Sequence, residues 1–121
     1  MKTVTEELAK AISEIKPALV ASAGKDGQPN VSAKGSFRVL DEQHLVFVDV
    51  MSPRTVGNLK ENPLISAMGL DSETREGWRI WGKVEEITTS GDLFDKFREE
   101  YATRGTVNHV VKILVEDALI F

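Results

Sequence analysis

The sequence predicts a small antiparallel β-barrel with peripheral helices, a mainly β fold with α decoration. Its 121 residues are enough for one domain, so we treat residues 1–121 as a single domain. Hydrophobic residues make up 41% of the chain, which is enough for one core. Six short runs with strand periodicity, mostly joined by turn sequences, alternate with three stretches of helical periodicity. A small barrel accommodates this order.

The predicted elements follow one another with short connections. In chain order they are a helix over 1–16, strands over 19–23, 30–39 and 45–50, a helix over 52–61, strands over 64–70 and 78–88, a helix over 90–102, and a strand over 109–115 trailed by 118–121. The polar segments 71–77 and 103–108 contain glycine, and we expect them to be able to act as lids.

Each helix prediction depends on apolar residues at helical intervals and on a signal for the helix start or end. Thr3 and Glu6 have the spacing of a capping box, and Pro17 ends the first run. Ser52 and Pro53 are a preferred pair of N-cap and first-turn residues. The third run places its aromatic side chains on one side.

The strand predictions depend on alternation of period two. In the run 30–39, Val31 and Phe37 fall on one face and Ser32 and Lys34 on the other. Residues 45–50 are nearly all apolar, which is typical of a strand buried on both faces.

Composition argues against several classes of function. The chain has no cysteine, which excludes disulfides, thiolate metal sites and iron–sulfur clusters. His44 and His109 lie far apart and outside any metal-ligand pattern, so we expect no metal site and assign no catalytic acid or base. The net charge of −4 argues against nucleic-acid binding. No apolar segment approaches membrane-spanning length, and we expect a cytoplasmic protein that does not bind membranes.

The most informative stretch is residues 49–58, where a buried strand leads directly into a helix. Unpaired N–H groups and the helix dipole make such a helix start suitable for an anion. Arg54 adds donors that match phosphate oxygens, and Thr55 adds a hydroxyl. A cation in the first turn opposes the dipole, and a bound anion would remove that conflict. The alternative is that Ser52 only caps the helix and Arg54 is a surface residue.

Two further features allow a structural or a functional interpretation. Ser32, Lys34 and Arg38 form a polar row that lies on a solvent face or points toward the same anion. Trp81 shares its strand face with charged residues, which is typical of an interface or ligand contact. We expect a subunit interface there first.

Taken in order, these pieces resemble the flavin-binding split barrels related to pyridoxamine 5′-phosphate oxidase, and especially the short members described as FMN-binding proteins. The segments that carry the resemblance are Leu19-Val20-Ala21-Ser22, Asp26-Gly27, Asn30-Val31-Ser32, Arg54-Thr55 with Asn58, Asn62-Pro63, and the strand from Trp78 to Gly82. The resemblance implies a six-stranded antiparallel split barrel. It also implies a homodimer that binds FMN at the subunit interface.

The resemblance also implies which residues bind the cofactor. They are Ser32, Ala33, Lys34, Val50, Met51, Ser52, Arg54, Thr55, Asn58 and Trp81. Arg54 and Thr55 would hold the phosphate, and Trp81 would approach from the partner chain. Pro53 stands where a polar or basic residue is common, and the sequence ends at Phe121, without the longer C-terminal segment of the oxidases. We therefore expect a protein other than pyridoxamine 5′-phosphate oxidase itself.

The function that this resemblance implies is that of a flavin reductase-like oxidoreductase or an electron-transfer protein, with a small-molecule or protein redox partner. One alternative is a non-redox small-barrel binding module. In it Lys34, Arg38, Phe37 and the two tryptophans would form a stacking groove for single-stranded nucleic acid. Another is that the pocket holds a different phosphorylated ligand, such as pyridoxal phosphate or a deazaflavin.

Overall fold

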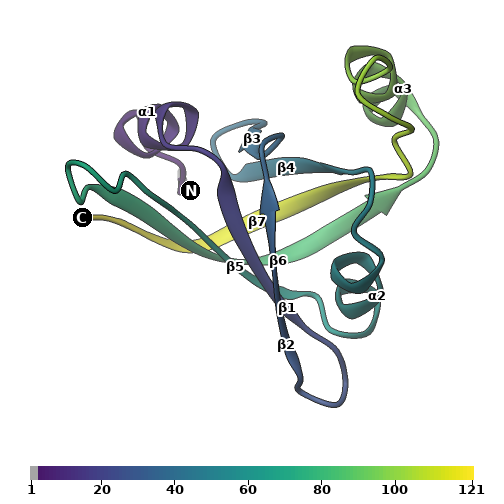
Figure 1. The fold of residues 1–121 in the computed structure, drawn as a ribbon, viewed down its shortest axis with the longest axis horizontal. Coiled ribbons are helices and arrows are strands. Elements are labelled where there is room, and N and C mark those ends of the chain that lie inside the picture. The colour runs from purple at the N-terminus through teal and green to yellow at the C-terminus, as the bar shows by residue number, and fades with distance from the viewer. Residues whose placement is uncertain (1–2) are drawn as a thin grey trace.

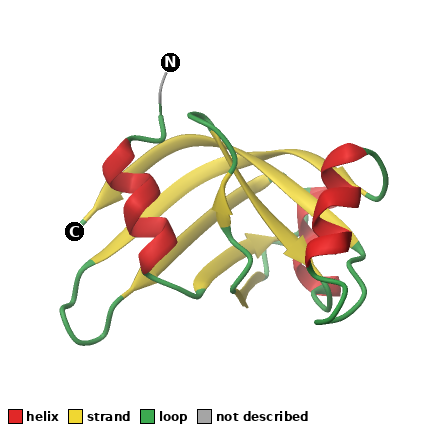
Figure 2. Ribbon diagram, turned by 90° about the horizontal axis from the view of Figure 1, so that it is seen from above, coloured by secondary structure: helices red, strands yellow, loops and turns green. Residues whose placement is uncertain are grey.

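The protein is a strongly curved antiparallel sheet with helices at both ends (Figures 1 and 2). The computed structural model describes residues 3–121. The elements are, in chain order, α1 (Glu6–Glu14), β1 (Ala18–Ala23), β2 (Pro29–Lys34), β3 (Arg38–Val39), β4 (His44–Asp49), α2 (Pro53–Glu61), β5 (Leu64–Leu70), β6 (Gly77–Thr88), α3 (Asp92–Glu100) and β7 (His109–Ile120). The strands lie in the order β2-β1-β5-β6-β7-β4-β3, and every neighbouring pair is antiparallel.

This architecture confirms the predicted mainly β fold, a split barrel with peripheral helices, but the sheet has seven strands rather than six. The predicted strand 30–39 is interrupted by a turn at residues 35–36, which separates β2 from β3. In the turn, the hydroxyl of Ser36 accepts a hydrogen bond of 2.9 Å from the N–H of Val48. A hydrogen bond to a side chain thus replaces backbone pairing between strands where the sheet bends. The alternating pattern of the sequence does not show where backbone pairing stops.

Two predicted boundaries also change. Helix α1 is capped by Thr5, whose hydroxyl accepts from the N–H of Leu8 at 3.1 Å, whereas the N–H of Thr3 donates to Glu42. Strand β7 continues without a break to Ile120, because β6 pairs with it as far as Trp78.

Strand β4 separates two apolar clusters, which explains its nearly continuous apolar sequence. Leu45 and Phe47 point into the main core, where Trp78 and helix α1 also pack. Val46 and Val48 point to the other side, toward a smaller cluster beneath α3. Both sides of β4 are therefore buried, as predicted.

Helix α2 lies beside the hairpin of β1 and β2, and this contact forms one wall of the candidate site (Figure 1). The hairpin turn uses Gly27 at a φ of 79°, a left-handed conformation that glycine adopts without strain. The N–H of Gly27 donates to the carbonyl of Gly24 at 3.1 Å. Among residues 3–121, no helix is long and apolar enough to cross a membrane.

Candidate functional site

The polar side chains of β2 face helix α2, and its apolar side chains face outward. Asn30 and Ser32 are half-buried, and Lys34 is only 7% exposed. Val31, between them, is 63% exposed. The polar row is therefore not a solvent face, and the alternative interpretation of that row is wrong for Ser32 and Lys34.

Thr55 fastens α2 to this polar row. Its side chain is 1% exposed. Its hydroxyl oxygen accepts from Nδ2 of Asn30 at 3.3 Å and lies 2.9 Å from the hydroxyl of Ser32. At the other end of the helix, Nδ2 of Asn58 donates to the hydroxyl of Ser22 on β1 at 3.3 Å. Both side chains hold the helix against the sheet.

Lys34 brings a buried positive charge to the start of α2. Its ammonium donates a hydrogen bond to the hydroxyl of Ser52 and lies 5.7 Å from the centre of the Phe47 ring. Burial lowers the pKa of the Lys34 amine from its usual range, and the nearby carboxylate of Asp49 acts in the opposite direction. Within residues 3–121, Lys34 forms no ion pair, so a buried cation meets only neutral acceptors.

Asp49, at the end of β4, connects the loop before α2 to strand β7. It is 3% exposed. One carboxylate oxygen accepts from the N–H of Ser52 at 2.7 Å, and the other lies 2.7 Å from Nδ1 of His109. Asn108 adds a bond of 2.8 Å from its side chain to the carbonyl of Val50. These contacts set the path of the chain into α2.

The first turn of α2 differs from the first turns of α1 and α3. Those helices begin with the acidic pairs Glu6 and Glu7, and Asp92 and Asp95, which the helix dipole favours. The first turn of α2 has no acidic residue and contains the exposed Arg54, whose side chain has no hydrogen-bond or ion-pair partner among residues 3–121. The start of α2 therefore has the donors and the charge that an anion needs.

A pocket of about 440 Å³ opens beside this helix start, and we call it the α2 pocket. Its lining residues are Asp49, Val50, Met51, Ser52, Pro53, Asn108 and His109. Of the two segments that we expected to act as lids, 103–108 contributes Asn108, whereas none of 71–77 lines the pocket. The loop 71–77 joins β5 to β6 and borders a different pocket, next to α1.

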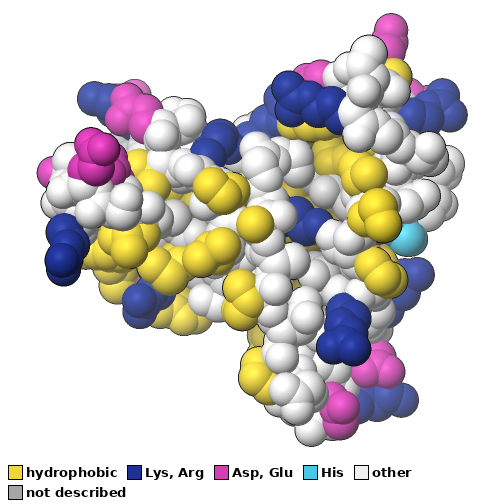
Figure 3. All heavy atoms as spheres, in the orientation of Figure 1, with side chains coloured by type: hydrophobic (Ala, Val, Ile, Leu, Met, Phe, Trp, Pro, Cys, Tyr) yellow, Lys and Arg dark blue, Asp and Glu magenta, His cyan; other side chains and the backbone are white. Residues whose placement is uncertain are grey.

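Ala33 and Trp81 lie on the opposite side of the sheet, on what we call the outer face. Cross-strand pairing aligns its residues in two rows, which consist of Val31, Ala21, Ser66 and Trp81, and of Ala33, Leu19, Met68 and Arg79. Trp81 is 36% exposed, and the guanidinium of Arg79 lies 5.8 Å from its ring centre. Figure 3 shows hydrophobic side chains spread over this part of the surface.

The structure thus divides the ten predicted site residues into three groups. Ser32, Lys34, Ser52, Thr55 and Asn58 lie between α2 and the sheet, in the contacts described above. Val50, Met51 and Arg54 lie at the surface around the start of α2, and Met51 is 89% exposed. Ala33 and Trp81 are on the outer face and do not join the others within one chain.

Two neighbouring residues that we considered do not belong to this site. Arg38 makes an ion pair with Glu100 at the end of α3 and lies 4.4 Å from the centre of the Phe97 ring. Phe37 is fully buried and stacks on Trp78 at 5.6 Å between ring centres. Trp78 is also fully buried, and Trp81 lies on the outer face, so these residues and Lys34 do not form one stacking groove.

Asp49 and His109 are the site residues that the sequence analysis missed. A signal was available, because Asp49 is the one charge at the end of an otherwise apolar strand. Its partner lies 60 positions away, and only the pairing of β4 with β7 brings them together.

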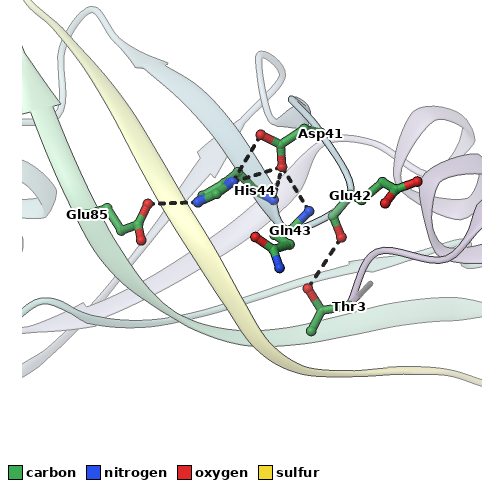
Figure 4. A network of polar contacts seen from close by, with 6 residues as sticks. All are labelled: Thr3, Asp41, Glu42, Gln43, His44 and Glu85. Atoms are coloured by element: carbon green, nitrogen blue, oxygen red, sulfur yellow. Dashed lines mark hydrogen bonds and ion pairs between the residues drawn. The ribbon is translucent and has the colours of Figure 1, made fainter. Parts of the chain in front are cut away.

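A second polar cluster surrounds His44, at the start of β4 (Figure 4). Nδ1 of His44 lies 2.8 Å from a carboxylate oxygen of Asp41, and Nε2 lies 2.7 Å from Glu85. Both ring nitrogens are therefore engaged. No group of three or more His, Asp or Glu residues in the described chain is arranged to hold a metal ion.

The fold and the site define a small split-barrel protein in which a pocket and two cationic side chains, Lys34 and Arg54, meet at the start of the helix that follows β4. The chain belongs to the pyridoxamine 5'-phosphate oxidase family, whose profile matches residues 4–117. The uncharacterized protein MJ0282 of Methanocaldococcus jannaschii is 38% identical over 65 residues, which are 52% of this chain and 43% of that protein. The match covers less than half the length of this relative.

Solved structures share the fold over almost the whole chain. HupZ from Group A Streptococcus is 28% identical and has a TM-score of 0.87, with 97% of this chain and 93% of that chain covered. An FMN-binding protein from Syntrophomonas wolfei is 13% identical with a TM-score of 0.83, over 94% and 86% of the two chains. HutZ, the heme storage protein from Vibrio cholerae, is 17% identical with a TM-score of 0.70, over 99% and 95%.

Proposed function

We propose that this chain binds FMN and acts as a flavin reductase-like oxidoreductase or an electron-transfer protein, with a small-molecule or protein redox partner. The observation that carries the proposal is the buried cation of Lys34, aimed at the start of a helix with no acidic residue in its first turn. A phosphate group suits this arrangement. The shared fold with the FMN-binding protein of Syntrophomonas wolfei supports FMN as the ligand that carries the phosphate.

The donors at the site fit a phosphate group. Lys34 and Arg54 supply positive charge, and the N–H groups of Arg54 and Thr55 meet no acceptor within residues 3–121. Because Lys34 donates to a neutral hydroxyl, it can turn to a phosphate oxygen without breaking an ion pair. Thr55 contributes through its position, since its hydroxyl already contacts Asn30 and Ser32.

When bound, FMN supplies the redox chemistry of its isoalloxazine ring, and the protein supplies binding and orientation. Lys34, Ser52 and Arg54 would hold the phosphate. Val50 and Met51, which line the α2 pocket, would contact the ring through their backbone and exclude water from one side.

We also propose that two copies of the chain form a homodimer through the outer face. The outer face includes a shallow hollow of about 340 Å³ between Leu19, Val31, Met68 and Trp81. Exposed apolar residues grouped in this way are typical of an interface. Since Trp81 and Lys34 lie on opposite sides of the sheet, one cofactor can contact both only if Trp81 comes from the partner chain.

The first test is a visible absorption spectrum of the purified protein, followed by mass identification of any compound that denaturation releases. Release of FMN supports the proposal. A colourless protein that also fails to quench the fluorescence of added FMN contradicts it, and release of pyridoxal phosphate or a deazaflavin supports the alternative of another phosphorylated ligand. The cytoplasmic location expected from the sequence stays a prediction.

The contribution of Arg54 has its own variant. Arg54→Ala should weaken FMN binding about 10- to 150-fold, the range for one charged hydrogen bond. Arg98→Ala is the matched control, because Arg98 is an exposed arginine in the last turn of α3, away from the α2 pocket. An unchanged FMN dissociation constant in Arg54→Ala would remove Arg54 from the site.

Haem is the second candidate ligand, because HutZ, described as a heme storage protein, shares the fold. One observation favours it: Asp49 holds Nδ1 of His109, which leaves Nε2 for a metal. The same release experiment separates the candidates, since a porphyrin and a flavin differ in mass and spectrum.

A further inference from the structure

We propose that the start of α2 in one copy seats in the hollow of its partner's outer face, so that the partner's Arg79 adds a third cation to the phosphate site. FMN binding and dimer formation then strengthen each other. The inference rests on the proposed FMN binding and homodimer and deepens them, because it names the two surfaces that meet and the way in which the ligand regulates their contact.

The proposed contact joins two unlike surfaces of the chain. Lys34 points toward the start of α2, whereas Trp81 lies on the outer face. A ligand that touches both side chains therefore lies between the α2 start of one copy and the outer face of the other. A two-fold axis makes this contact twice, because each copy supplies both surfaces. Such a dimer closes on itself and holds two equivalent sites.

The two surfaces offer a projecting apolar side chain and an apolar hollow. Met51, just before α2, is 89% exposed, which is the highest value among the large apolar side chains of residues 3–121. The hollow has a volume of about 340 Å³, and its apolar lining includes Leu19, Val31, Met68 and Trp81. A flexible methionine side chain fills irregular apolar gaps well. A second copy of this chain therefore supplies a suitable occupant for the hollow.

Arg79 is the one charged residue among those that line the hollow. Its guanidinium lies 5.8 Å from the centre of the Trp81 ring and forms no ion pair within residues 3–121. The α2 start of the other copy brings Lys34 and Arg54, which also form no ion pair there. The nearby carboxylate of Asp49 offsets only part of this charge. Without a bound anion, cations of the two copies therefore repel one another.

A phosphate group changes this repulsion into attraction. A phosphate monoester carries a charge of about −1.5 to −2 near neutral pH, which Lys34, Arg54 and the partner's Arg79 can share. A ligand that binds the dimer more tightly than the monomer shifts the equilibrium toward the dimer. By linkage, dimer formation tightens ligand binding by the same factor, and we expect a coupling of about 5- to 150-fold.

The first experiment measures the dimer dissociation constant by sedimentation velocity without ligand, with FMN, and with riboflavin, which has the same ring but no phosphate. FMN should lower the constant about 5- to 150-fold, and riboflavin should lower it much less. Arg79→Gln should strengthen the ligand-free dimer and reduce the effect of FMN, because it removes the third cation. Arg98→Gln, which changes an exposed arginine on α3, should behave as wild type. A dimer constant that FMN leaves unchanged would overturn the coupling.

The second experiment tests which surfaces meet. The chain has no cysteine, so introduced thiols report only their own contacts. Met51→Cys protein and Met68→Cys protein are mixed, allowed to exchange subunits and treated with a short thiol-to-thiol cross-linker. We expect a covalent dimer in the mixture and none in either protein alone, because Met51 meets the hollow rather than a second Met51. A cross-link in Met68→Cys alone, with none in the mixture, would show that the outer faces meet each other and would overturn the proposed contact.

The two experiments separate failure of this inference from failure of the proposed function. If the protein binds FMN and sediments as a dimer, but FMN leaves the dimer constant unchanged and the mixture gives no covalent dimer, the assigned surfaces are wrong. FMN binding and the homodimer then stand. If wild-type protein takes up no FMN, or remains a monomer with FMN bound, the proposed function fails, and wild-type protein shows this before any variant is made.

Discussion

The two faces of strand β2 differ in a way that reverses the usual arrangement of a barrel strand. The face toward α2 carries Asn30, Ser32 and Lys34, and its lysine is 7% exposed. The outer face carries Val31, which is 63% exposed. Buried polar side chains and exposed apolar ones on one strand are each informative, because the hydrophobic effect favours the opposite placement.

This difference indicates that each face of β2 is suited to a partner outside the strand. On the face toward α2, which we call the inner face, the polar groups form hydrogen bonds with Thr55 and Ser52, and the buried charge suits an anion. No element among residues 3–121 covers the outer face, which suits a second copy of the chain. The substitutions below test the two faces separately.

The largest expected effect is on the outer face. Val31→Asp would place a carboxylate in each copy of an apolar interface, which costs several kcal/mol, so the dimer dissociation constant should rise by at least about 100-fold. Sedimentation velocity measures this. Ile120→Asp is the control, since Ile120 is 45% exposed but pairs with the core residue Trp78, on the opposite side of the sheet from the outer face. Val31→Asp protein that remains as dimeric as wild type would show that the partner binds elsewhere.

The next effect is on the inner face. Lys34→Met should weaken FMN binding about 10- to 150-fold through loss of a charged donor. The same substitution should leave the free energy of unfolding unchanged or higher, because it replaces a desolvated cation by an apolar side chain of similar length. Titration calorimetry and urea unfolding test the two halves. A large loss of stability with unchanged FMN affinity would make Lys34 a structural residue.

The pH dependence of Lys34 sharpens this prediction. Burial lowers the pKa of Lys34 in the folded protein, so between the folded pKa and the usual 10.5 the unfolded chain binds more protons. Stability contributed by this group should therefore rise with pH through that window. Lys34→Met should remove the rise, which urea unfolding at several alkaline pH values can detect, and a rise of the same size in both proteins would contradict it.

A smaller effect is expected at the joint between β2 and α2. Thr55→Val keeps the shape of the side chain but leaves Asn30 and Ser32 without their shared partner, which should cost about 1–3 kcal/mol of unfolding free energy. Thr55→Ser, which keeps the hydroxyl, is the matched control. If both variants unfold at the same urea concentration, the hydroxyl contacts contribute nothing to stability.

The smallest effect lies outside β2, in the cluster around His44. Burial alone would raise the pKa of the Asp41 carboxyl, but hydrogen bonds from Gln43 and His44 lower it below 3.8 (Figure 4). The contribution of Asp41 to stability is therefore present at pH values above its pKa in the unfolded chain. It is lost as pH falls through the lower pKa of the folded protein. As pH falls, Asp41→Asn should lose slightly less unfolding free energy than wild type does. An identical acid-unfolding profile for the two proteins would contradict this.

Local signals were enough to predict most helices and strands and one part of the site. The apolar run of β4 predicted its double burial, and Ser52 with Pro53 predicted the start of α2. The conflict between Arg54 and the helix dipole pointed to an anion before any contact was visible. Each of these signals lies within a few residues of the feature that it predicts.

The prediction of one strand over 30–39 failed for a reason that is not local. The sheet bends there, so the chain turns at residues 35–36 and Phe37 enters the core against Trp78. The alternation of side chains describes the two faces of a strand, but it carries no record of where the strand must end.

By itself, the sequence determined the order of the elements, the family resemblance and the cationic start of α2, because these depend on periodicity and on neighbours along the chain. Only the tertiary structure decided that the polar face of β2 is the buried one, that Thr55 bonds to the sheet, and that Asp49 meets His109. Those outcomes depend on strand register and on which side of the sheet α2 covers. Both are set by packing between residues far apart in sequence.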